Sequence, residues 1–291
     1  MAVNYGTKYN VGKGKINIYT EGEGEYTIVF LSGAGVTSPV LEYRTLYRRL
    51  SDAYRIAVVE KSGYGMSEST DTERTVENMV GESREALKLA GINPPYILAP
   101  HSYSGHETIY WANTYPDEVK AVLSIDMGLP ESAVEFGKIM TSDKLKAMAE
   151  RNKKLYAKIQ KRGLFAKLVK KFSVDTTKML SSDNLNDEEK ALYADLFYKN
   201  LTNKEIFEEN LHLVSNGEKA GATGKLKVPA YFYISDMKMP MKSGSWKEYG
   251  IKYAEEIGAE YTVTDKGHNM YSVIPEEMAK NFKNFLKKHN M

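Results

Sequence analysis

The feature that most constrains the fold is a regular alternation of strand-like and helix-like segments between residues 26 and 126. Short runs rich in β-branched and other apolar residues, such as residues 55–60 and 96–99, are separated by segments with apolar residues at helical spacing. Strands that alternate with helices are typical of a mostly parallel sheet with helices on both faces. We therefore expect a doubly wound α/β fold.

The same spacing of apolar residues predicts where each strand and helix begins and ends. Charged residues and glycines at 21–25 indicate a turn between the first two strands, which we expect to pair as a hairpin. The expected strands are residues 16–20, 26–31, 55–60, 96–99, 121–125, 228–234 and 260–264, and the expected helices of the sheet region are 39–50, 75–90, 105–114, 246–257 and 275–287.

A second region interrupts the alternation near Pro130. To about residue 225 only helical spacing appears, with one amphipathic segment at 155–172 and another that opens near Asp187. We predict a core formed by residues 1–130 and 226–291 and a helical cap formed by residues 131–225. Residues 138–178 contain thirteen Lys+Arg and three Asp+Glu, whereas residues 179–219 contain four and nine. We interpret this split as solvated helix faces; contact of the basic half with an anionic membrane is the alternative.

Composition excludes several classes of protein. The 291 residues carry 40 Lys+Arg against 38 Asp+Glu, so a net charge of +2 does not favour nucleic acid as a partner. No cysteine is present, which excludes disulfides and cysteine nucleophiles and fits a reducing compartment. With no signal-like apolar run and no stretch long enough to span a membrane, we expect a cytoplasmic protein. Its oligomeric state is left open.

A serine follows the predicted strand 96–99 and leads directly into a helix. In an open parallel sheet, reactive groups lie at the carboxyl ends of strands. Small residues around Ser102 are what a nucleophile elbow requires, although Pro100 and Ser104 stand where the G-x-S-x-G pattern has glycine. The alternative is an ordinary serine at the start of a helix.

Two further loops follow strands of the same sheet. The loop Ser32-Gly33-Ala34-Gly35 follows the strand 26–31, and its Ala34 amide could form an oxyanion hole with the Tyr103 amide. A flexible turn is the alternative. His268 follows the strand 260–264, where a general base comes last in the order serine, acid, histidine. The acid is either Asp126 or Asp236, each at the end of a strand, and we favour Asp126.

Four separated segments together resemble the α/β-hydrolase superfamily. Residues 30–35 are similar to its oxyanion loop, residues 60–67 to its D-x-x-G-x-G-x-S segment, residues 100–105 to G-H-S-x-G-G, and Gly267-His268 to its histidine loop. The helical insertion matches the family's cap. The chain departs from the family at the elbow glycines, and Lys238 stands where the acid usually lies. Some branches hold the acid after the preceding strand, where this chain has Asp126.

The resemblance implies a serine hydrolase with Ser102 as nucleophile, His268 as base and no metal or organic cofactor. Serine rather than aspartate at position 102 argues against epoxide hydrolase or dehalogenase chemistry. We expect a small, apolar ester as substrate, while amide and C–C bond hydrolysis would use the same residues. Because Ser104 also resembles small hydrolase-fold receptors, a ligand sensor with little turnover is the alternative function.

Overall fold

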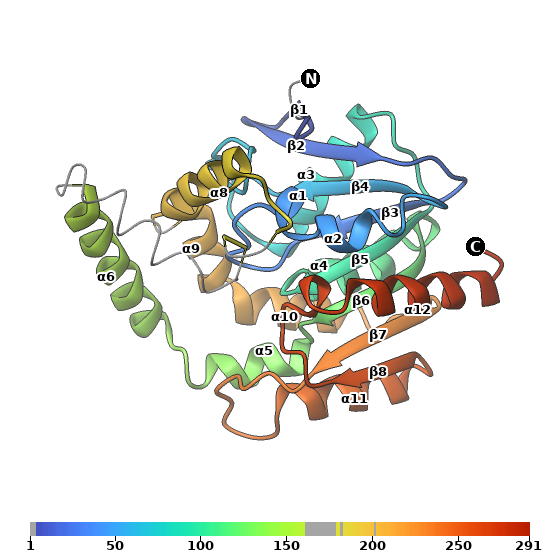
Figure 1. The fold of residues 1–291 in the computed structure, drawn as a ribbon. Helices are drawn as coiled ribbons and strands as arrows, with labels where there is room; N and C mark the ends of the chain where they lie inside the picture. The colour runs from blue at the N-terminus through green and yellow to red at the C-terminus, as the bar shows by residue number, and fades with distance from the viewer. Residues whose placement is uncertain (1–3, 161–178, 181–182, 201) are drawn as a thin grey trace.

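A single sheet of eight strands organises the molecule (Figure 1). The computed structural model describes residues 4–160, 179–180, 183–200 and 202–291. The strands are β1 (Thr7–Val11), β2 (Gly14–Glu21), β3 (Thr27–Leu31), β4 (Arg55–Glu60), β5 (Tyr96–Ser102), β6 (Val119–Met127), β7 (Ala230–Ser235) and β8 (Glu260–Thr264). They lie in the order β1-β2-β4-β3-β5-β6-β7-β8.

Strands β3 to β8 are parallel, and β1 and β2 join the sheet antiparallel at one edge. The alternating α/β fold predicted from the sequence is therefore confirmed. Because all six strands run the same way, their carboxyl ends meet at one edge of the sheet. This edge gathers the loops that follow β3, β5, β6, β7 and β8.

Helices cover both faces of the sheet. Their bounds are α1 (Pro39–Glu42), α2 (Arg44–Tyr47), α3 (Val76–Leu89), α4 (Ser104–Thr114), α11 (Trp246–Glu256) and α12 (Pro275–Lys288), with 3-10 turns η1 (Pro116–Glu118) and η3 (Met270–Ser272). The expected helix at 39–50 is two short helices that meet at Tyr43 (φ −85°, ψ 0°).

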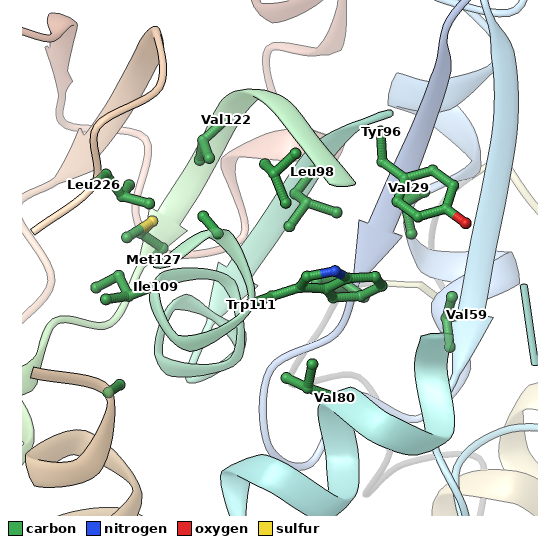
Figure 2. Close-up of a cluster of buried hydrophobic side chains, with 14 of the residues drawn as sticks. Val29, Val59, Val80, Tyr96, Leu98, Ile109, Trp111, Val122, Met127 and Leu226 are labelled. Atoms are coloured by element: carbon green, nitrogen blue, oxygen red, sulfur yellow. The ribbon is translucent and has the colours of Figure 1, made fainter. Parts of the chain in front are cut away.

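Side chains alternate between the two faces along each buried strand. In β3, Val29 belongs to the buried cluster that includes residues of α3, α4 and α11, whereas Ile28 and Phe30 belong to the cluster that includes residues of α1, α2 and α12. Figure 2 shows the first of these cores, in which Trp111 of α4 lies among Val29, Val59 and Val80. A strand buried on both faces reads as a continuous apolar run, which is why the sequence of β3 was detectable.

The predicted hairpin between the strands at 16–20 and 26–31 is wrong. Strand β2 pairs with β1 and β4, while β3 pairs with β4 and β5, so the hairpin is formed by β1 and β2 instead. Gly22 and Gly24 do not form a free turn. A Cβ atom would lie 2.4 Å from Ser51 O at Gly22 and 2.7 Å from Ala53 O at Gly24, so these glycines permit close backbone packing.

Five described helices lie between β6 and β7, and we call them the insertion. They are α5 (Pro130–Gly137), α6 (Ser142–Gln160), α8 (Asp187–Asn200), α9 (Lys204–Leu211) and α10 (Leu213–Ala222). The helix start near Asp187 is confirmed. Most of the predicted amphipathic segment at 155–172 lies outside the described residues. The boundaries of core and cap remain a prediction. In Figure 1, α6, α8 and α9 lie to one side of the sheet.

Candidate active site

Ser102 is held in a left-handed backbone conformation at the end of β5. Its φ is +55°, which is unusual for a residue other than glycine and stores strain. The chain turns there from β5 into α4, which begins at Ser104. A Cβ atom at Gly33 would lie 2.4 Å from Ser102 Cβ and 3.1 Å from Ser102 Oγ, so only glycine permits the loop after β3 to approach the serine this closely.

The two departures from the elbow pattern are accommodated locally. Ser104 is fully buried, and its Oγ accepts a hydrogen bond from the His101 amide and donates to the Leu31 carbonyl, both at 2.9 Å. The hydroxyl thus ties the elbow to β3. Pro100 occupies a position in β5 opposite Leu31. Glycine is required at the next position, Gly105, because a Cβ atom there would lie 2.1 Å from the Gly128 carbonyl oxygen.

His268 and Asp126 form a short, partly buried pair. Nδ1 of His268 lies 2.5 Å from Oδ2 of Asp126. A carboxylate only accepts hydrogen bonds, so this contact assigns the proton to Nδ1 and leaves Nε2 of the imidazole free to accept one. The His268 ring lies 4.5 Å from that of His101, the residue before Ser102.

Three further donors surround the Asp126 carboxylate. Oδ1 accepts from the Ser235 amide at 2.7 Å and from Trp246 Nε1 at 2.8 Å, and Oδ2 accepts from Ser235 Oγ at 2.5 Å. Asp126 is 1% exposed and has a φ of +52°. Hydrogen bonds to a charged acceptor stabilise its charged form. Asp236, by contrast, is exposed in the loop after β7.

His101 connects the elbow to the histidine loop. Its Nε2 lies 3.2 Å from the His268 carbonyl oxygen, so Nε2 is the donor, and its Nδ1 accepts from the Tyr43 hydroxyl at 3.2 Å. Burial, together with the neighbouring His268, lowers the pKa of His101 well below its ordinary value. His101 is therefore a neutral residue that holds the backbone of His268.

The predicted oxyanion residues belong to two segments next to the serine. Ala34 follows Gly33 in the loop that touches Ser102, and Tyr103 immediately precedes α4. The structure brings together Ser102, Ala34, Tyr103, His268 and Asp126 at the carboxyl edge of the sheet, and it leaves Asp236 on the surface.

Glu60 supports the neighbouring loops from the position where the family pattern has aspartate. It is fully buried, accepting hydrogen bonds from the Met66 amide at 2.7 Å and from Ser38 Oγ at 3.1 Å. Burial raises the pKa of Glu60 to about 7. Trp246 and Ser235, which bind the carboxylate of Asp126, were not predicted from the sequence. The place of Ser235 at the end of a strand was the available signal.

No described helix is long and apolar enough to cross a membrane. In the same part of the chain, no three His, Asp or Glu side chains converge in a way that could hold a metal ion.

The sequence of the chain is similar to those of several known proteins. It is 32% identical to the Bacillus subtilis (strain 168) protein YbdG over 288 residues, covering 97% of this chain and 86% of YbdG. It is 25% identical over 119 residues to a 2-(acetamidomethylene)succinate hydrolase of Mesorhizobium japonicum, 41% of each chain. No protein-family model matches the chain.

Solved structures share the whole fold at low sequence identity. The enol-lactonase of Burkholderia xenovorans LB400 superimposes with a TM-score of 0.65 and 18% identity, covering 97% of this chain and all of the enzyme. The parallel sheet, the strained serine after β5 and the likeness to these proteins agree. The chain belongs to one family with YbdG and has the α/β-hydrolase fold.

Proposed function

We propose that the protein is a serine hydrolase that cleaves a carboxylic ester, or a related acyl bond, through an acyl-enzyme on Ser102. The observation that carries the proposal is the left-handed backbone of Ser102, with φ at +55°. Such strain persists where surrounding structure over-determines it, and it clusters at active sites. An elbow serine of this kind presents its Oγ at the carboxyl edge of the sheet.

The proposed reaction has two stages. Ser102 Oγ attacks the carbonyl carbon while His268 Nε2 takes the serine proton, and the Asp126 carboxylate stabilises the resulting imidazolium through Nδ1. His268 then passes the proton to the leaving alkoxide as its bond to the acyl carbon breaks. A water molecule, deprotonated by His268, attacks the acyl carbon, releases the acid and restores Ser102.

The amides of Ala34 and Tyr103 are the proposed donors to the oxyanion. Gly33 supports this role because its close contact with Ser102 brings the loop before Ala34 to the reacting serine. Each such donor is typically worth about 3 kcal/mol in the transition state. These steps use side chains and backbone of this chain alone.

The substrate class is proposed as a small ester of apolar character. Among the similar proteins, one is named as a hydrolase, one as an enol-lactonase and one as a haloalkane dehalogenase. The serine at position 102 favours the acyl chemistry of a lactonase over that of a dehalogenase. Aromatic side chains near the elbow support an apolar acyl or alcohol group: the rings of Tyr103 and Phe136 lie 6.5 Å apart.

Two measurements on one sample test the proposal. A fluorophosphonate probe should label the peptide that contains Ser102, and a panel of short and long p-nitrophenyl esters should give many turnovers per protein. Absence of labelling contradicts the nucleophile. A single stoichiometric burst without turnover contradicts an enzyme and favours the ligand sensor.

A further inference from the structure

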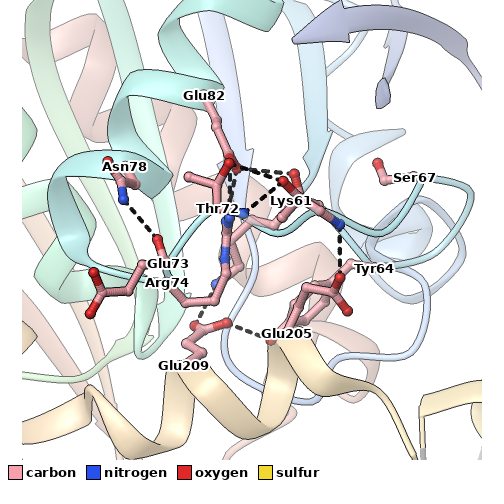
Figure 3. Close-up of polar contacts among 12 residues, drawn as sticks. Lys61, Tyr64, Ser67, Thr72, Glu73, Arg74, Asn78, Glu82, Glu205 and Glu209 are labelled. Atoms are coloured by element: carbon pink, nitrogen blue, oxygen red, sulfur yellow. Dashed lines mark hydrogen bonds and ion pairs between the residues drawn. The ribbon is translucent and has the colours of Figure 1, made fainter. Parts of the chain in front are cut away.

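Helix α9 of the insertion turns carboxylates, rather than apolar side chains, toward the core. Its buried residues are Glu205 and Glu209, each 3% exposed. Figure 3 shows both projecting from the helix toward the loop that carries Lys61 and Tyr64. Burying a carboxylate is unfavourable unless it is paired, so the contacts of these two residues define what the helix does.

Glu209 uses its two oxygens for two different partners. Oε1 lies 2.5 Å from Lys61 Nζ, and Oε2 accepts a hydrogen bond from the Tyr64 hydroxyl at 2.6 Å. Lys61 also lies 3.0 Å from Glu107 of α4, the helix that begins just after Ser102. One ammonium is thus shared by two buried carboxylates, one from the core and one from the insertion.

The Tyr64 hydroxyl continues this connection to the oxyanion loop. It accepts a hydrogen bond from the Gly35 amide at 3.3 Å. Because the Tyr64 proton is directed to Glu209, a lone pair of the oxygen remains for Gly35. Burial and the nearby Glu209 raise the pKa of Tyr64 well above its ordinary value, so the phenol keeps that proton.

Gly35 is the residue after Ala34, the proposed oxyanion donor. Its φ is +81°, and nothing lies within 4 Å of a Cβ atom built there, so packing against a side chain does not fix this position. The bond to Tyr64 holds the peptide that follows Ala34. Removing this bond would free the loop to change the direction of the Ala34 amide.

We propose that Glu209 is a positioning residue that orders the oxyanion loop through Tyr64, so that the insertion takes part in transition-state stabilisation. This inference rests on the proposed function, and it adds a residue remote from the reacting atoms. Hydrogen bonds in a buried chain strengthen one another, which makes the orientation of Tyr64 depend on the charge of Glu209.

Glu205 provides a matched control on the same helix. Its carboxylate accepts from the Thr70 amide at 2.9 Å and from Ser69 Oγ, and it packs against Gly63. It therefore fastens α9 to the same loop of the core as Glu209 does. None of these contacts leads to the oxyanion loop.

The experiment compares Glu209→Gln, Tyr64→Phe, their double variant and Glu205→Gln with the unaltered protein. Measurements are kcat and KM for a soluble p-nitrophenyl ester, the rate of fluorophosphonate labelling, and the melting temperature. We expect Glu209→Gln and Tyr64→Phe each to lower kcat and the labelling rate about tenfold with little change in KM, part of the effect of losing an oxyanion donor.

The kcat of the double variant should be no more than about twofold below that of the less active single variant, because both substitutions act through the same hydrogen bond. Glu205→Gln should lower the melting temperature while kcat stays within about twofold of the unaltered protein. If Glu209→Gln does not fold, Tyr64→Phe carries the test, since it leaves the pair of Glu209 with Lys61 intact.

Three results would overturn the inference: unchanged kcat in Tyr64→Phe, losses that multiply in the double variant, or an equal loss of kcat in Glu205→Gln. Failure of the proposed function has a different signature. In that case the unaltered protein itself shows neither ester turnover nor labelling at Ser102.

Discussion

Ser102 and Asp126 share a left-handed backbone, with φ at +55° and +52°, at the ends of neighbouring parallel strands. The Gly128 amide donates to the Ser102 carbonyl at 2.6 Å and joins the two turns. The turn that follows Asp126 therefore holds the backbone of Ser102. This arrangement fixes the nucleophile and the acid of the proposed triad on one rigid support.

Replacing Ser102 by alanine should abolish hydrolysis and covalent labelling while the protein stays folded. Losing a triad nucleophile lowers turnover by about 10⁶. Ester turnover and mapping of the labelled peptide check this expectation. Ser104→Gly is the control, because Ser104 is fully buried and its hydroxyl bonds the backbone. That variant should lower stability and keep labelling at Ser102; a label on Ser104 in the unaltered protein would contradict the assignment.

The Asp126→Asn variant should lose about 10⁴ in turnover, as in the corresponding change of serine proteases, because the imidazolium loses its charged partner. The exposed Asp236→Asn is the matched change and should lose at most about tenfold. Turnover at neutral pH, with folding checked by thermal melt, measures both. The opposite ranking would move the acid to the loop after β7.

Trp246→Phe should lower kcat with little change in KM. The change removes the Nε1 donor that lies 2.8 Å from Asp126 Oδ1 and keeps an aromatic ring beside His268, whose centroid is 5.5 Å away. A hydrogen bond to a charged group contributes about 1.5–3 kcal/mol, so a loss of at least about tenfold is expected. A variant that alters KM alone would show that the indole contacts substrate instead of orienting the acid.

The stability of the protein should fall in acid partly because of His106. Burial lowers the pKa of His106 from 6.5 to about 4. A depressed pKa in the folded state means that the stability due to neutral His106 is present above pH 6.5 and is lost as the pH falls through about 4. His106→Phe should therefore show a smaller decrease in the free energy of unfolding between pH 7 and pH 4, by up to about 3 kcal/mol.

Denaturant unfolding at the two pH values measures this difference. Glu60, whose pKa burial raises to about 7, titrates in both proteins, so its contribution cancels in the comparison. Equal decreases in the variant and the unaltered protein would show that His106 does not titrate in this range.

Most strands of the sheet could be predicted from the sequence, because buried parallel strands read as apolar runs. Strand β1 was not predicted. Asp126 follows the apolar run at 121–125, whereas His268 follows β8, an edge strand that is only partly buried. The pairing of β2 was not predictable in the same way. The neighbour of a strand depends on contacts with residues far away in the chain. Glycines at positions 22 and 24 are compatible both with a hairpin turn and with close backbone packing, so they do not distinguish the two.

Glu209 could not be predicted from the sequence, for a different physical reason. Within α9 the buried positions are glutamates, whereas Ile206 and Phe207 line a groove with α6. The spacing of apolar residues predicts that the apolar side of a helix faces the core, whereas in α9 the side that carries the glutamates faces the core. The partners Lys61 and Tyr64, more than a hundred residues away in the chain, explain why the Glu209 carboxylate points inward.

The shared ammonium of Lys61 has a consequence for the order in which the chain matures. During synthesis, residues 61 and 107 leave the ribosome well before residue 209, so the nascent core holds Lys61 with one carboxylate and Tyr64 without its acceptor. Under the proposed role of Glu209, the oxyanion loop takes its final form only when α9 has docked. Competence for the reaction is therefore acquired late in biosynthesis, after every strand up to β6 has already been made.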